Sequence, residues 1–395
     1  MKRILFVEDE PSIRMALQWM VRPMQAEWET RFAEDAAAGL RVLEQWPAEV
    51  VVSDFSMPGL DGADFLQEVM RRYPRTVRLI LSGYAPEGAM VRCVGVIHQF
   101  LLKPCSPAIL KQTIARIDRL ASSVRNESLM RMLNRVTHLP TPPRLYVELS
   151  ELLQSPETGL EDIAAAVERN PDLTSRVLKL VNSGFFGLGQ PVSNLLEALG
   201  YVGMEVLKGL VLALQTFHPY TLHHPPGINV EEVWHHSVRV AGLAREIARL
   251  ESGPADAAFV AGLLHDIGKL VFALNCPEEY LAATRLAGEL SLPLVAAEEK
   301  VFGCHHADLA GYLLGLWGLP PEVVEAIALH HDLEIVEERT EFTALTAVHV
   351  ANACAKAQPE AIASGQVPGL NLGYLRQLGV LDRLEDWIAL TTSHA

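Results

Sequence analysis

Cysteine is scarce in this sequence and shows no pairing pattern. The 395 residues include only five cysteines, Cys93, Cys105, Cys276, Cys304 and Cys354, an odd number with no Cys-x-x-Cys spacing. This excludes a disulfide framework and a cysteine-based zinc site, and it is typical of free thiols in a reducing compartment. We therefore expect a cytoplasmic protein.

Positive charge is also in short supply. Lysine and arginine number 33 against 48 acidic residues, which gives a formal net charge of −15. Proteins grip a phosphate backbone with clustered lysine and arginine, so this balance argues against an extended nucleic-acid surface. No helix-turn-helix segment with a basic recognition helix stands out, and we expect no direct DNA binding.

Long apolar runs are missing as well. The best candidate, "FVAGLLHDIGKLVFALN", is interrupted by His265, Asp266 and Lys269, so we expect no membrane span. At the amino terminus "MKRILFV" is followed directly by "EDE", which leaves the apolar region too short for a signal peptide.

Two different patterns of apolar residues follow each other along the chain. Up to about residue 120, the apolar runs "RILFV", "EVVVSD", "VRLILSG" and "HQFLLKP" alternate with segments of helical spacing. This alternation predicts an α/β fold, a doubly wound, five-stranded parallel sheet with its functional crevice at the carboxyl ends of the strands. Beyond that point strand signals stop, and helical patterns separated by proline and glycine predict an all-α domain.

The domain boundaries follow from this change. We expect an α/β domain over residues 1–120, a helical linker over 121–137, a helical domain over 138–340, and further helices over 341–395 that complete it. The helical spacing that runs from Ile109 to Leu133 covers too few heptads for a coiled coil, but it leaves a homodimer contact open.

Polar side chains follow the predicted strands where each one ends. Glu8 and Asp9 follow the first strand, Asp54 the third, Ser82 the fourth and Lys103 the fifth. Three converging carboxylates need a cation, and an all-oxygen site suits Mg²⁺. Asp54 could then accept a phosphoryl group, with Lys103 and Ser82 contacting it. The alternative, ordinary capping residues, would not explain five matching residues at four strand ends.

These residues resemble the receiver domain of two-component response regulators. The matching pieces are "FVEDEPSIR", "SDFSMPGLDG", "LILSGY" and "FLLKPCSP". The resemblance implies a flavodoxin-like fold and a Mg²⁺ site made by Glu8, Asp9, Asp54 and the main-chain carbonyl of Ser56. Asp54 would be the phosphoacceptor of this bacterial type of phosphorelay.

The same resemblance implies a switch and a partner. Ser82 and Phe100 stand where the family has its switch residues, and Lys103 stands at its phosphate-binding lysine. The donor of the phosphoryl group would be a sensor histidine kinase.

Histidines are concentrated in the second half of the chain. Ten of the 14 lie between His218 and His331, several of them in adjacent pairs. Imidazoles and a carboxylate suit Fe, Mn, Ni or Zn. The candidate ligands are His236, His265, Asp266, His306 and His330 (or its neighbour His331), with Lys269 one turn beyond His265 as a candidate phosphate contact. Hydrogen-bonded core histidines are the alternative.

The surrounding sequence resembles an HDOD domain, a member of the HD superfamily. "LPTPPRLYVELSELLQ", "DIAAAVERNPDLTSRVLKLVNSGFFG", "FVAGLLHDIGKL" and "HHADLAGYLLGLWGLPPEVVEAIALHHD" carry the resemblance, over most of residues 130–355. HDOD domains are thought to act as signalling or partner-binding modules, whereas the related HD-GYP phosphodiesterases cleave cyclic di-GMP at a metal site.

Two departures separate this chain from the catalytic relatives. Asn352 stands where the family has its final metal carboxylate, and no Gly-Tyr-Pro follows "ALHHDLE". We therefore expect a response regulator whose HDOD output is non-catalytic and binds an unknown protein or ligand. The alternative is a metal-dependent phosphohydrolase or cyclic-nucleotide phosphodiesterase gated by the receiver.

Overall fold

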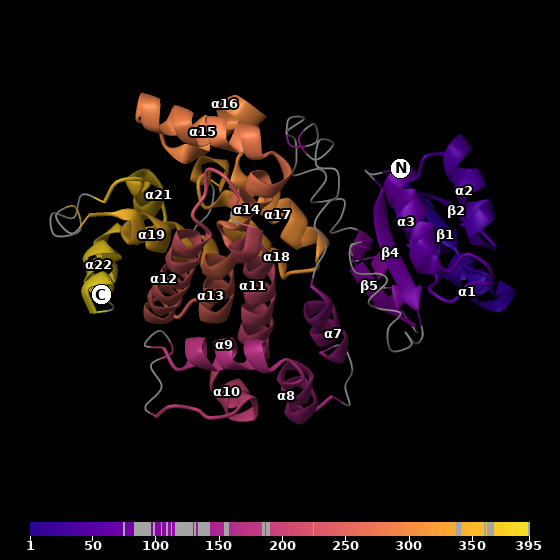
Figure 1. Cartoon of the computed structure of the whole chain (residues 1–395), viewed down its shortest axis with the longest axis horizontal. Helices are drawn as coiled ribbons and strands as arrows, with labels where there is room; N and C mark the ends of the chain where they lie inside the picture. Colours follow the sequence, from indigo (N-terminus) through magenta and orange to yellow (C-terminus); the bar gives the residue numbers. More distant parts are fainter. Residues whose placement is uncertain are drawn as a thin grey trace. The chain divides into compact units, whose positions relative to one another are not determined.

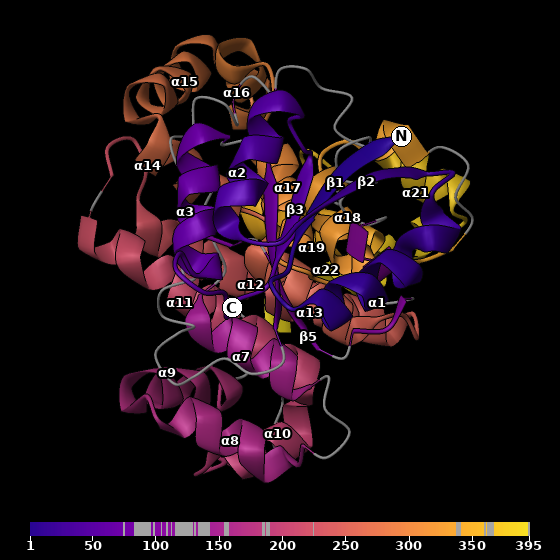
Figure 2. The same ribbon diagram turned by 90° about the vertical axis from the view of Figure 1, so that its right-hand side faces the viewer.

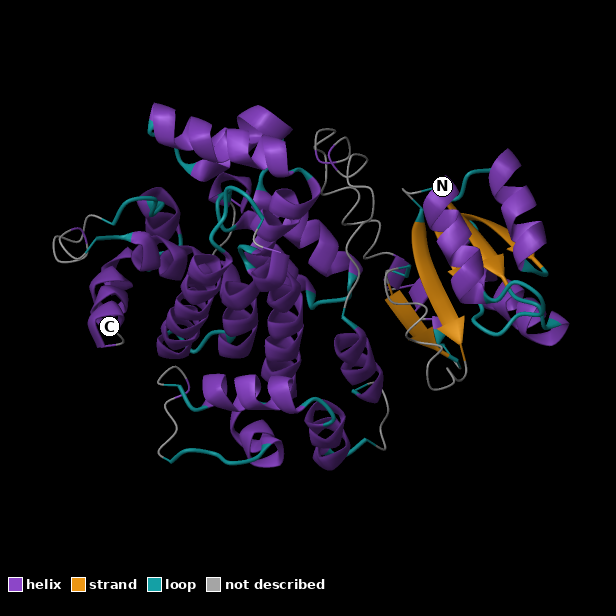
Figure 3. Cartoon of the chain, in the orientation of Figure 1, coloured by secondary structure: helices purple, strands orange, loops and turns teal. Residues whose placement is uncertain are grey.

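The computed structural model describes residues 1–73, 76–82, 96–97, 99–103, 105–107, 110–111, 113–114, 129, 132, 143–153, 158–183, 186, 190–223, 225–336, 341–358, 361 and 367–393. The chain divides into two compact units, one built on the amino-terminal strands and one on the helices from Leu160 onward. In Figure 3 the orange strands mark the first unit, and the second unit is drawn with purple helices. Apart from residues 129 and 132, the predicted linker and its dimer contact lie outside the described residues.

The first unit contains the predicted five-stranded parallel sheet, in the order β2-β1-β3-β4-β5. Its elements are β1 (Lys2–Val7), α1 (Pro11–Val21), β2 (Trp28–Ala33), α2 (Ala36–Gln45), β3 (Val50–Ser53), α3 (Gly62–Arg72), β4 (Val77–Ser82) and β5 (Gln99–Leu102). This is the flavodoxin-like order, in which the chain changes direction between β1 and β3. A crevice at the carboxyl ends of these two strands is therefore expected, and the acidic side chains lie there.

The burial of each strand explains which strands could be recognised from apolar runs in the sequence. The central strands β1 and β3 are buried almost throughout, as both-face coverage of a parallel sheet requires, and they appear as continuous apolar runs. In contrast, β2 lies at the edge of the sheet and buries only its end residues, Trp28 and Ala33. Its sequence "WETRFA" therefore lacks an apolar run.

The second unit is all-helical, as predicted. Its helices are α8 (Leu160–Glu168), α9 (Pro171–Val181), α10 (Leu195–Val202), α11 (Met204–His223), α12 (Val230–Leu250), α13 (Ala255–Leu264), α14 (Ile267–Asn275), α15 (Pro277–Leu290), α16 (Leu294–Phe302), α17 (His306–Leu316), α18 (Pro321–Leu329), α19 (Ala344–Lys356), α21 (Leu372–Gln377) and α22 (Leu384–Ser393). Helix α12 packs along α13 and α19, while α8, α9 and α10 gather at one end and α15 and α16 at the other (Figures 1 and 2).

The prediction that no apolar stretch is long enough to span a membrane is wrong for Ala255–Asn275. By length and hydropathy alone this stretch is long enough to cross a membrane, contrary to our expectation, but 94% of its most apolar window is buried inside the protein. It forms α13 and α14, with His265 and Asp266 at the junction between the two helices. Such burial is typical of a core helix pair.

Candidate functional site

Three carboxylates meet at the carboxyl ends of β1 and β3. Glu8 and Asp9 follow β1, Asp54 follows β3, and one oxygen of each lies within 4.8 Å of the others. We call these three residues the acidic pocket. The Asp54 N–H donates to the Val7 carbonyl at 2.8 Å, which fixes the two strand ends side by side. Glu8 is 1% exposed and Asp54 8%, so the pocket concentrates negative charge out of water and favours a bound cation.

Lys103, directly after β5, supplies one positive charge. Its Nζ donates to Glu8 Oε2 at 2.6 Å and to Asp54 Oδ1 at 2.9 Å. Burial alone would lower the pKa of Lys103, but these hydrogen bonds and the two negative charges raise it overall. Burial raises the pKa of Glu8 against the opposing effect of Lys103. Glu8 Oε1 remains buried with no hydrogen-bond partner in the described part of the chain, and such an oxygen donor fits Mg²⁺.

The loop between β3 and α3 folds back against Asp54. The Gly62 N–H donates to the Phe55 carbonyl at 2.9 Å, and a Cβ at Gly62 would lie 2.1 Å from the Asp54 carbonyl oxygen. Only glycine permits this approach. Ser56 is exposed in the same loop.

The two predicted switch residues belong to neighbouring strands. Ser82 ends β4 opposite Leu102, and Phe100 lies in β5 opposite Ile80. The strand pairing therefore puts Ser82 at the same end of the sheet as Lys103. The side chains of Ser82 and Phe100 lie outside the described residues.

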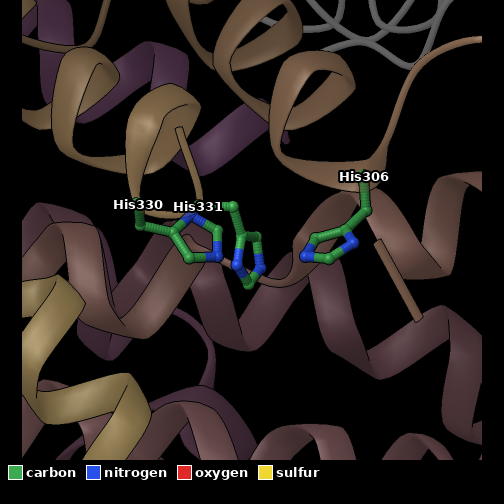
Figure 4. A group of neighbouring side chains, drawn as sticks. All are labelled: His306, His330 and His331. Carbon is green, nitrogen blue, oxygen red and sulfur yellow. The ribbon is translucent and has the colours of Figure 1, made fainter. Parts of the chain in front are cut away.

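A second buried group of side chains lies in the helical unit. It consists of His236 in α12, His265 and Asp266 between α13 and α14, His306 at the start of α17, and His330 and His331 directly after α18. We call these six residues the histidine cluster. Donor atoms of His236, His265 and Asp266 lie within 4.8 Å of one another, and so do those of His306, His330 and His331. Figure 4 shows these last three rings approaching one another.

The imidazoles are oriented by hydrogen bonds on one ring nitrogen. The Nδ1–H groups of His265 and His330 donate to the carbonyls of Gly262 and Ile327, each at 2.7 Å. Because a carbonyl only accepts, Nε2 of each ring carries a lone pair. The Nε2 atoms of His265, His306, His330 and His331 are buried without a hydrogen-bond partner among the described residues. Each such atom costs about 1–3 kcal/mol, and a metal ion would satisfy several together.

Burial keeps the rings of His236, His265, His330 and His331 neutral by lowering their pKa. It lowers the pKa of His236 to about 4 and that of His265 to about 3, although the charge of Asp266 opposes the shift. Burial also lowers the pKa of His330 and of His331, and the neighbouring histidines add to the effect. A neutral imidazole is the form that binds a metal.

Glu298, in the middle of α16, contacts the imidazole of His306. Its Oε2 lies 2.6 Å from His306 Nδ1, and both side chains are buried. When His306 donates Nδ1–H to this carboxylate, its Nε2 and Asp266 Oδ1 are two acceptors only 3.1 Å apart. A cation held by these two atoms would relieve that contact. A carboxylate behind a histidine is also the usual support of a metal ligand.

Gly268 explains part of the "HDIGK" sequence. A Cβ at this position would lie 2.0 Å from the His306 carbonyl oxygen. Its absence lets the first turn of α14 touch the start of α17, which holds Asp266 next to His306. The close packing of α14 against α17 therefore requires glycine at this position of "HDIGK".

On the side of the cluster formed by His236 and Asp266, two potential metal ligands already contact other side chains. His236 Nε2 lies 3.0 Å from Asn352 Oδ1, and Lys269 Nζ donates to Asp266 Oδ2 at 2.6 Å. Burial disfavours the charged form of Asp266, yet His265, Lys269 and His306 hold its pKa well below its usual range. His236 Nε2 and Asp266 Oδ2 are thus already engaged, whereas the Nε2 atoms of His306, His330 and His331 have no hydrogen-bond partner in the part of the chain that the structure describes.

Sequence patterns missed some residues around the cluster. Glu298 lies eight positions before His306, a spacing without a motif. His305 was seen only as one of a pair, but its Nε2 lies 2.7 Å from Asp332 Oδ2 and forms a separate group with Asp308. The resemblance left the choice between His330 and His331 open, and the structure places both in the cluster.

Comparisons with known proteins agree with this architecture. The response regulator receiver domain model matches residues 4–115, and the HDOD domain model matches residues 139–333. An uncharacterized protein of Treponema pallidum (strain Nichols) is 26% identical over 202 residues, which are 51% of this chain and 39% of that protein. The hydrogenase transcriptional regulatory protein HoxA of Cupriavidus necator is 34% identical over 113 residues, 28% of this chain and 23% of HoxA. The chain thus spans well under half of these relatives.

A solved structure resembles the helical half. A crystal structure of an HDOD domain protein with unknown function from Geobacter sulfurreducens superposes with a TM-score of 0.56 at 24% identity, covering 69% of this chain and 95% of that one. At this identity the likeness concerns the fold. A flavodoxin-like receiver domain and an HDOD domain are thus joined in one chain. This chain is a response regulator of two-component signalling, with a receiver domain followed by an HDOD domain.

Proposed function

We propose that Asp54 accepts a phosphoryl group from a sensor histidine kinase. The observation that carries this is the position of Lys103 between Glu8 and Asp54, 2.6 Å and 2.9 Å from their oxygens. Lys103 can pair with an added phosphoryl charge without moving far. Glu8, Asp9, Asp54 and the Ser56 carbonyl would hold Mg²⁺, which neutralises phosphoryl oxygens.

The signal then passes from the receiver to the HDOD domain. Ser82 would bind the phosphoryl group, and Phe100 would report its presence by changing the surface around β4 and β5. Such a change is a two-state switch biased by a local charge. The HDOD domain would respond by presenting a different surface to an unknown partner protein or ligand, in the cytoplasm.

The HDOD domain is proposed to hold one transition-metal ion in a supporting role. His306, His330 and His331 offer three Nε2 atoms that have no hydrogen-bond partner among the described residues, and Asp266 Oδ1 lies 3.1 Å from His306 Nε2. Together these residues supply four donors, the number that closes the shell of a structural zinc site, whereas a catalytic site keeps a position open. Iron, manganese and nickel remain alternatives, since imidazole and carboxylate suit all of them.

A non-catalytic output is favoured by the contacts on the other side. His236 is engaged with Asn352, and Lys269 is engaged with Asp266. A second metal ion would need His236 Nε2 and Asp266 Oδ2 as ligands. A substrate phosphate would need Lys269.

One observation favours the alternative, a receiver-gated phosphohydrolase. Lys269 is not alone, since the charge of Lys356 in α19 also acts on Asp266 and His236. Two ammonium groups beside the histidine cluster could hold a phosphate. Measurement of bis-p-nitrophenyl phosphate turnover with and without added Mn²⁺ separates the two functions. Turnover that His265→Ala abolishes would establish the alternative.

A further inference from the structure

A cavity of about 420 Å³ lies between α9, α11 and α12, outside both sites described above. Its size is within the range of pockets that enclose small molecules. Each of the three helices contributes residues three or four positions apart, so one face of each helix turns toward the cavity. The chemistry of the lining indicates what it can bind.

The floor of the cavity is apolar and aromatic. Leu214 and Phe217 of α11 are buried at its base. Trp234 of α12 contacts Phe217 edge to face, with ring centroids 5.1 Å apart. Trp234 itself is only half-buried, so an aromatic surface faces the space. A flat apolar group would fit against these two rings.

The rim of the cavity is positively charged. Arg176 and Lys179, one turn apart in α9, line the space together with the exposed His235. Glu231 is the single acid among the described residues that line it. Arg176 also forms an exposed ion pair with Asp172 at 3.0 Å, which compensates part of its charge. The lining itself holds two permanent cations and one carboxylate, and because Asp172 outside the lining already pairs with Arg176, Lys179 is the main contact for an anion.

We propose that this cavity binds a small aromatic anion. Its ring would pack on Phe217 and Trp234, and its carboxylate, sulfonate or phosphate would lie between Arg176 and Lys179. The site is connected to the histidine cluster through α12, because His236 directly follows Trp234 and His235 on this helix. A ligand here therefore contacts the helix that positions one member of the cluster, and could modulate the output independently of the receiver.

Fluorescence titration of the full chain with 8-anilinonaphthalene-1-sulfonate tests the proposal. Binding should give saturable energy transfer from tryptophan, reduced in Trp234→Phe. Lys179→Glu replaces attraction by repulsion at an exposed position and should raise the dissociation constant about fivefold to tenfold. Lys300→Glu, an equally exposed charge reversal on α16, is the matched control and should bind as the wild type does.

Competition identifies the ligand class. 1-Naphthoate should displace the probe about tenfold better than neutral 1-naphthalenemethanol, and inorganic phosphate alone should not displace it. Equal probe affinity of Lys179→Glu and Lys300→Glu would overturn the proposal, and so would equal competition by the neutral and the anionic naphthalene. Displacement by phosphate alone would also overturn it, since the site would then recognise the charge without the ring.

Discussion

His236 and Asn352 face each other in the core of the HDOD domain, with His236 Nε2 3.0 Å from Asn352 Oδ1. The amide stands where a metal carboxylate is expected from the HD superfamily. It satisfies the histidine by a hydrogen bond and contributes no negative charge. The pair therefore occupies His236 by a hydrogen bond, while the Nε2 atoms of His265, His306, His330 and His331 have no hydrogen-bond partner among the described residues.

Asn352→Asp should restore the missing carboxylate. An aspartate of nearly the same shape adds the negative charge that a divalent ion needs beside His236, His265 and Asp266. We expect the metal content to rise from about one to about two ions per chain, as measured by elemental analysis of protein prepared without chelators. Unchanged content would show that this side of the cluster is closed for another reason.

Glu298→Gln should weaken metal binding without removing a ligand. The substitution keeps the shape behind His306 but removes the charge that makes its imidazole a stronger donor, and such changes cost about 10–100-fold in affinity. Competition with a fluorescent zinc chelator measures the effect. Glu299→Gln, the exposed neighbour in α16, is the control and should bind like the wild type.

Metal removal should destabilise the HDOD domain. An ion present at 100 times its dissociation constant stabilises the folded state by about 2.7 kcal/mol, so dialysis against a chelator should lower the melting temperature by several degrees. His330→Ala should have lost this dependence, whereas His235→Ala, exposed on another face of α12, should retain it. A melting temperature insensitive to chelation in the wild type would argue against a structural ion.

Asp54→Asn should abolish labelling of the receiver by radioactive acetyl phosphate in the presence of Mg²⁺. Asp64→Asn changes an exposed carboxylate in α3 and should be labelled as the wild type is. Labelling of Asp54→Asn at the wild-type level would rule out Asp54 as the acceptor.

Gly62→Ala should impair the same reaction through the backbone. Its Cβ would lie 2.1 Å from the Asp54 carbonyl oxygen, so the β3–α3 loop must shift, at a cost of about 1–3 kcal/mol. Urea unfolding should show this loss, and the labelling rate should fall. A variant that is as stable and as readily labelled as the wild type would contradict the packing of this loop.

The sequence was most informative where one local pattern decides the structure. Continuous apolar runs revealed β1 and β3, because both of their faces are buried, and residues at strand ends pointed to the acidic pocket. The edge strand β2 has no such run, since water covers much of it. The membrane-length stretch Ala255–Asn275 shows the reverse difficulty, because a helix pair buried on all sides resembles a span.

The histidine cluster could be predicted only as a set of residues. Identity and spacing suggested which side chains might share a site, but not which ring nitrogens are free. That depends on contacts between distant segments, such as Glu298 with His306 and Asn352 with His236. The same holds for the cavity beside α12, whose walls come from three separate helices.

The most direct test of the account combines metal analysis with a hydrolysis assay on the same chelator-free preparation of the full chain. A phosphorylatable response regulator with a closed, supporting metal site should contain about one transition-metal ion per chain, lose it in His306→Ala, and show no turnover of bis-p-nitrophenyl phosphate with or without acetyl phosphate. Two or more ions per chain together with turnover stimulated by acetyl phosphate would contradict it.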